Sequence, residues 1–167
     1  MMKKLLVLFC VFYFSVVLYA QNDFFIKFFS QRIDISVQED DTQKYYDGDI
    51  IPELLYGSKI ISNGMAVVSV FDSEFLLKKG QGILISKDPI TGELLVYKID
   101  SSKDDKIAVT LNKYITTELK QDNIFSFSKL GRTIKLKLLC GDSTLVENGK
   151  STTIHAGDFL YYKKLGD

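Results

Sequence analysis

The 167-residue sequence contains no tryptophan, one histidine, two cysteines and two prolines. A zinc or iron site of the cupin kind needs at least two histidines on neighbouring strands, so the single His155 excludes one. The lack of tryptophan weakens a carbohydrate-binding interpretation. Basic and acidic residues number 21 each, so no excess positive charge points to nucleic acid or to an anionic membrane surface.

The amino terminus has the three parts of a signal peptide. Lys3-Lys4 precedes an apolar stretch over residues 5–18, and Tyr19-Ala20 is followed by polar residues. The apolar stretch is shorter than the roughly 20 residues that cross a bilayer as a helix, so we expect residues 1–20 to be a signal peptide cleaved after Ala20. The residue two positions before Ala20 is a leucine, not a small residue, and retention as a membrane anchor is the alternative. The predicted location is periplasmic or extracellular, with no membrane span after cleavage.

The two cysteines are separated by that cleavage. Cys10 lies inside the apolar stretch without the small residues of a lipoprotein signal, and cleavage removes it. Cys140 then has no partner for an internal disulfide. Because free cysteine is among the most buried residue types, we expect Cys140 to be a small core residue. A reactive thiol, or one that pairs with another chain, is the alternative.

Most of residues 21–167 alternate between apolar and polar side chains, as in strands. In the run over 134–138, Ile134, Leu136 and Leu138 would face the core, while Lys135 and Lys137 would face water. Five further runs have strand character: 33–37, 65–71, 94–99, 107–111 and 124–128. The run over 65–71 is apolar on both faces and predicts a central strand. Residues 23–31 fit a helix or a strand, and we favour the strand.

Turn signals separate these runs at short intervals. Asn63-Gly64 and Asn148-Gly149 are typical of two-residue hairpins, in which both turn residues have positive φ. Many short strands with frequent turns predict an all-β fold, an antiparallel β-sandwich or β-roll. We expect one domain over 21–167, with a possible sub-division near 100–106.

The order of strands and turns resembles the FecR domain, a periplasmic β-module of bacterial regulators of iron uptake. The matching features lie within residues 32–162. They include the strand 33–37, Gly48-Asp49, Gly57 before 59–62, the strand 66–71 with Asp72-Ser73 after it, and 75–77. A later part is similar over 131–162, including Ala156-Gly157-Asp158.

The departures from that family limit what the resemblance implies. FecR regulators carry a cytoplasmic segment that engages a sigma factor, and here only four residues precede the apolar stretch. Sigma-factor control is therefore not carried over. The resemblance implies a stand-alone exported FecR-like domain whose partners are one or more unidentified envelope proteins. Its oligomeric state stays open.

Candidate catalytic and ligand sites are weak. Ser151, His155 and Asp158 lie close in sequence, but no nucleophile motif accompanies them and we expect His155 to be an ordinary strand residue. Asp47-Gly48-Asp49 is better explained as a turn than as a calcium loop, because apolar residues follow where oxygen ligands are required. Gly80-Gln81-Gly82 lacks the lysine and helix of a phosphate loop. Asp104-Asp105 lies in a mixed-charge segment typical of a solvated loop.

The predicted function is therefore contact with other proteins, without catalysis and without a cofactor or metal. Exposed tyrosines could anchor such contacts, although ordinary strand packing is the expectation for each one. The candidates are Tyr45, Tyr46, Tyr56, Tyr97, Tyr114, Tyr161 and Tyr162. A surface module that binds a glycan or another envelope component is the alternative.

Overall fold

The computed structural model describes residues 23–37, 40–46, 53–99 and 106–163, which form strands and turns without a helix. The predicted signal peptide over 1–20 and the turn Asp47-Gly48-Asp49 lie outside these ranges. None of the described residues forms a helix with the length and hydropathy to cross a membrane. The strands are β1 (Phe24–Phe29), β2 (Ile33–Val37), β3 (Asp40–Tyr46), β4 (Ser58–Ser62), β5 (Ala66–Val70), β6 (Ser73–Leu77), β7 (Gly82–Lys87), β8 (Leu94–Lys98), β9 (Ile107–Asn112), β10 (Ile115–Leu119), β11 (Ile124–Leu130), β12 (Thr133–Cys140), β13 (Asp142–Glu147), β14 (Lys150–His155) and β15 (Phe159–Lys163).

The strands form two antiparallel sheets. Sheet A has seven strands in the order β1-β5-β6-β9-β10-β13-β14, and sheet B has eight in the order β15-β12-β11-β8-β7-β4-β2-β3. The apolar sides of the two sheets share one core cluster. The predicted all-β class is confirmed, and the arrangement is consistent with a β-sandwich.

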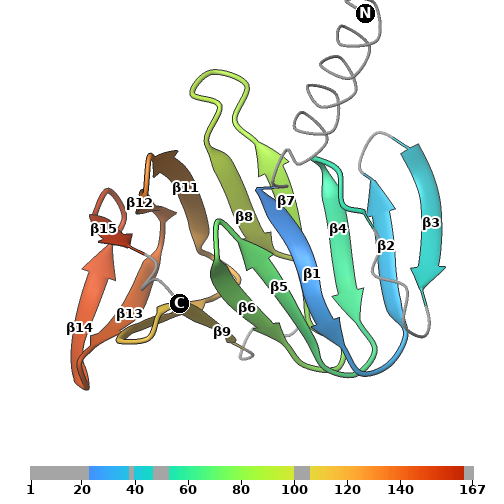
Figure 1. The fold of residues 1–167 in the computed structure, drawn as a ribbon, viewed down its shortest axis with the longest axis horizontal. Helices are drawn as coiled ribbons and strands as arrows, with labels where there is room; N and C mark the ends of the chain where they lie inside the picture. Colours follow the sequence, from blue (N-terminus) through green and yellow to red (C-terminus); the bar gives the residue numbers. More distant parts are fainter. Residues whose placement is uncertain (1–22, 38–39, 47–52, 100–105, 164–167) are drawn as a thin grey trace, which may run out of the picture.

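From β5 onward the chain adds strands by a regular rule. It places a pair in sheet A, a pair in sheet B, and then returns to sheet A. Within each sheet the new pair bonds to the previous one through β6·β9, β10·β13, β8·β11 and β12·β15. We call this arrangement the hairpin stack. It grows toward the end that carries β13, β14 and β15, opposite β3 in the view of Figure 1.

The core is built from aromatic and branched side chains on the facing sides of both sheets. Phe75 of sheet A meets Phe127 of sheet B with ring centroids 5.9 Å apart, and Phe125 lies 6.3 Å from Phe127. The buried Ser73 and Tyr162 hydroxyls form a hydrogen bond between the sheets. Burial raises the pKa of Tyr162 well above its usual range.

Local alternation predicts seven of the fifteen described strands. Residues 33–37 are β2, the run 134–138 lies within β12, and Ile134, Leu136 and Leu138 are buried as expected, while Lys135 and Lys137 are half-buried. Residues 23–31 contain a strand, β1, as favoured. The run 65–71 contains β5, which has sheet neighbours on both sides.

One prediction about a turn is wrong. Asn63-Gly64 does not close a hairpin, because it joins β4 of sheet B to β5 of sheet A, and neither residue has a positive φ. The hairpin β5–β6 instead turns at Phe71 and Asp72, with φ of 45° and 70°. Phenylalanine rarely adopts this conformation, but Phe71 packs against the core, and its N–H bonds to the carbonyl of Asp23.

The segment considered for a sub-division lies mostly outside the described residues, at 100–105. Strand pairing continues across this segment in both sheets. In sheet A, β6 pairs with β9 through Glu74–Thr110, Phe75–Val109 and Leu76–Ala108, and in sheet B β8 pairs with β11.

Candidate protein-contact site

Four turns of identical design lead into strands of sheet B. In each, the side-chain oxygen of the fourth residue accepts a hydrogen bond of 2.8–3.1 Å from the backbone N–H of the first. The backbone N–H of the fourth residue also donates to the carbonyl of the first. The turns occupy residues 55–58, 78–81, 120–123 and 155–158, and their fourth residues are Ser58, Gln81, Asn123 and Asp158.

The two middle turns also form hydrogen bonds with the next hairpin of sheet A. The Gln81 amide donates to the carbonyl of Lys106, just before β9, at 3.3 Å. The Asn123 amide donates to the carbonyl of Asp142, the first residue of β13, at 3.2 Å. Both amide side chains are 1% exposed. Each therefore connects one step of the hairpin stack to the next.

The last turn has lost this connection. Asp158 is exposed, and a carboxylate has no N–H to donate. In the described part of the chain no sheet A hairpin follows it. Within the described residues, position 158 belongs to the last step of the stack, and it presents an acceptor where earlier steps present a donor.

The burial of the residue immediately before each of the last three turns shows how closely that step of the hairpin stack is packed. Leu77 and Leu119 precede the middle turns and are fully buried. Ile154 precedes the last turn and is only half-buried. The same position in the fold is therefore core in two steps and partly open to solvent in the third.

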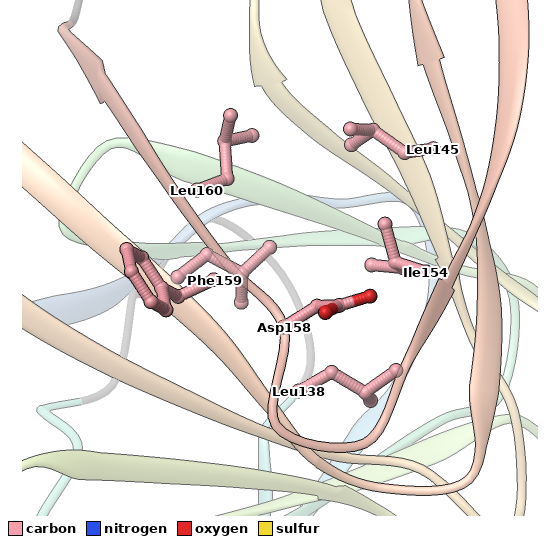
Figure 2. A pocket seen from close by; sticks show the side chains of 7 residues that line it. Leu138, Leu145, Ile154, Asp158, Phe159 and Leu160 are labelled. Atoms are coloured by element: carbon pink, nitrogen blue, oxygen red, sulfur yellow. The ribbon is translucent and has the colours of Figure 1, made fainter.

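An apolar hollow lies beneath the last hairpin, β13–β14. Figure 2 shows the side chains of Leu138, Leu145, Ile154 and Leu160 around it, with the Asp158 carboxylate among them. Its volume is about 70 Å³, and a hollow lined by leucine and isoleucine favours an apolar side chain over water. The lining residues are Leu136, Leu138, Leu145, Ile154, Asp158, Phe159 and Leu160.

The outer side of the same end carries exposed aromatic side chains. Phe159 and Tyr161 are 60% and 51% exposed and meet edge to face at 5.5 Å. The Lys135 ammonium lies 5.7 Å from the centre of the Phe159 ring. Exposed aromatics beside a cation are frequent anchors of protein contacts.

The structure places His155 at the surface, at the end of β14. Its Nδ1 lies 2.8 Å from Oδ1 of Asp142, and its backbone N–H donates to Asp158. Ser151 lies four residues earlier on the same strand, which places it about 13 Å away. These residues therefore do not assemble a catalytic triad. Among the described residues, no group of three or more histidine, cysteine, aspartate or glutamate side chains could hold a metal ion.

The expectation that Cys140 is buried is wrong, because the residue is exposed. It is the last residue of β12, where the chain leaves sheet B for β13 of sheet A, so its side chain falls beyond the core layer. Gly80-Gln81-Gly82 lies at a turn and the start of β7, as expected. Tyr162 is buried, whereas Tyr56, Tyr114 and Tyr161 are exposed.

The repeated turn is not among the features predicted from the sequence, although its copies share a recognisable pattern. Lys-Lys-Gly-Gln, Lys-Gln-Asp-Asn and His-Ala-Gly-Asp each stand directly before a strand of sheet B. All three end in a side chain that can accept a hydrogen bond. The fourth turn, Leu-Tyr-Gly-Ser, ends in a hydroxyl and extends the pattern.

Over the described residues, fold and site together define a two-sheet antiparallel β-domain whose last hairpin, β13–β14, has no further hairpin packed beside it. No protein-family model, no curated protein and no solved structure matches this chain.

Proposed function

We propose that this protein is an exported, non-enzymatic FecR-like domain that acts through protein–protein contacts in the cell envelope. The observation that carries the proposal is the uncovered end of the hairpin stack, where β14 borders an apolar hollow. Apolar surface of this kind on an exposed strand edge is typical of sites that bind other proteins. A role in signalling follows only from the FecR resemblance.

A glycan-binding module stays the alternative, because Phe159 and Tyr161 are exposed side by side. Their rings are inclined at 74°, so they do not form the flat platform on which a sugar ring would stack. This geometry favours the protein-contact proposal.

Photo-crosslinking in intact cells tests the proposal. A photoreactive residue at Thr153, on the outer face of β14, should give a reproducible adduct with a protein of the envelope. The matched control is Lys59, an exposed position on the interior strand β4, where no such adduct should form. The absence of any protein adduct at Thr153, with the domain correctly exported, would overturn the proposal.

A further inference from the structure

The open strand edges of the two sheets differ in how they are protected against pairing. Edges are commonly guarded by charges, bulges or covering segments. At β1 the register shifts between Ile26 and Phe28, and Lys27 stands at the shift. Strand β3 has the sequence Asp-Asp-Thr-Gln-Lys-Tyr-Tyr, with three charged residues.

At β15 the last residue is tied to sheet A. The carbonyl of Lys163 accepts a hydrogen bond from the Asn112 amide of β9 at 3.3 Å. Strand β14 is less protected. Its lysine, Lys150, stands at the first position, residues 151–154 carry neither charge nor proline, and the strand pairs with β13 through six successive residues without a register shift. Among the described edges, β14 is the one suited to accept another strand.

The sequence of β14 is complementary to itself. Thr152 and Ile154 lie on the inner face with Leu145, and the residues between them lie on the outer face. A second β14 can pair antiparallel to the first about a two-fold axis at Thr153. The inner faces of the two strands then lie on the same side of the sheet, and so do their outer faces. Ile154 then lies opposite Thr152 of the other copy, and His155 lies opposite Ser151. No pair of like charges comes face to face.

The hollow and its rim fit the same arrangement. The inner face of the second β14 brings its Ile154 beside the hollow, so that apolar surface of each copy is covered by the other. Lys150 of the second copy lies opposite Ala156, in the turn that holds Asp158. The charges on the two sides of this contact are therefore opposite in sign.

We propose that the partner at β14 is a second copy of this chain, joined by β14·β14 pairing about a two-fold axis at Thr153. Sheet A then runs continuously through both copies. An isologous contact of this kind closes on itself, whereas the guards at β1 and β3 oppose head-to-tail growth into filaments. The inference rests on the proposed function insofar as both assign protein contact to the same end.

A single engineered cysteine tests the arrangement in the mature exported chain. In a Cys140→Ser background, Thr153→Cys places two thiols on the axis, within the Cα separation of roughly 4.4–6.8 Å that a disulfide needs. The matched control is Thr144→Cys, on the same face of β13 and directly opposite Thr153 within one copy. Across the dimer the two 144 positions are separated by three strand spacings, or about 14 Å. Mild oxidation should give a covalent dimer for T153C and none for T144C.

Light scattering after size exclusion provides the second measurement. The wild-type chain should have twice the monomer mass, and Thr152→Lys should have the monomer mass with an unchanged circular dichroism spectrum, because an inward charge on an edge strand opposes pairing. A wild-type chain that is monomeric at every concentration and gives no T153C dimer overturns the inference. If Thr153 then still crosslinks another envelope protein in cells, the proposed function stands. If it crosslinks nothing, both proposals fail.

Discussion

The hairpins β9–β10 and β13–β14 occupy successive steps of the same stack, yet only the first is covered. Strand β10 alternates between buried and exposed or half-buried positions, and Leu119 at its end is fully buried. Strand β14 is exposed at every position except the half-buried Ile154. The two hairpins follow one design, so the difference lies in whether another hairpin packs beside them. An element's burial here depends on its place in the stack as much as on its own sequence.

Truncation of Leu119 and Ile154 to alanine should show the difference between the two hairpins most clearly. Leu119→Ala should lower the free energy of unfolding by about 3 kcal/mol, because it leaves a cavity in the closed core. Ile154→Ala should cost only about 1 kcal/mol, because solvent already reaches that side chain. Urea unfolding in the Thr152→Lys background measures both without a contribution from self-association. Equal losses would show that the last hairpin is as well covered as the one before it.

Gly141→Ala should have the next largest effect, at the connection between the two hairpins. Gly141 has a φ of 71°, and an added Cβ would lie 2.6 Å from the Asn123 amide nitrogen. Left-handed strain and the displaced amide together should cost about 2 kcal/mol, measured as a shift in the urea midpoint. Gly131→Ala is the control, since φ there is 64° but nothing lies within 4 Å. A loss no larger than that of the control would rule out the close approach.

The repeated turn itself should respond differently at its covered and uncovered positions. Asn123→Ala removes a buried acceptor and two donated hydrogen bonds, so we expect a loss of about 1.5 kcal/mol. Asp158→Ala removes one exposed bond to the His155 N–H and should cost less than about 0.5 kcal/mol. The melting temperatures of the two variants, measured in parallel, test whether their losses of stability differ in this way. Similar changes in melting temperature would contradict a connecting role for Asn123.

A local effect is expected at the tip of the uncovered hairpin. Asn148 and Gly149 have φ of 49° and 79°, so Gly149→Ala forces a side chain into the left-handed region at a cost of about 1 kcal/mol. The loss should stay local, and hydrogen exchange should quicken in β13 and β14 but not in β9 and β10. Faster exchange throughout the molecule would mean that the last hairpin unfolds only with the whole domain.

Local pattern predicted the strands but not their surroundings. Alternation identified β2 and the two faces of β12, because the side-chain period of a strand depends only on neighbouring residues. The hairpin predicted at Asn63-Gly64 does not form, because the same dipeptide can close a hairpin or carry the chain between sheets, and the pairing of distant strands decides which. Cys140 was misplaced for a related reason. Its residue type favours burial, but the crossover from β12 to β13 places it outside the core layer.

The sequence by itself determined that the chain is all-β, and it located seven of the fifteen described strands and the Asn148-Gly149 hairpin. Only the tertiary structure decided which sheet each strand joins, which turns repeat, and which hairpin is left uncovered. The position of a strand can be predicted from the alternation of adjacent residues. Coverage arises from contacts between segments far apart in the chain, as the different burial of Leu119 and Ile154 illustrates.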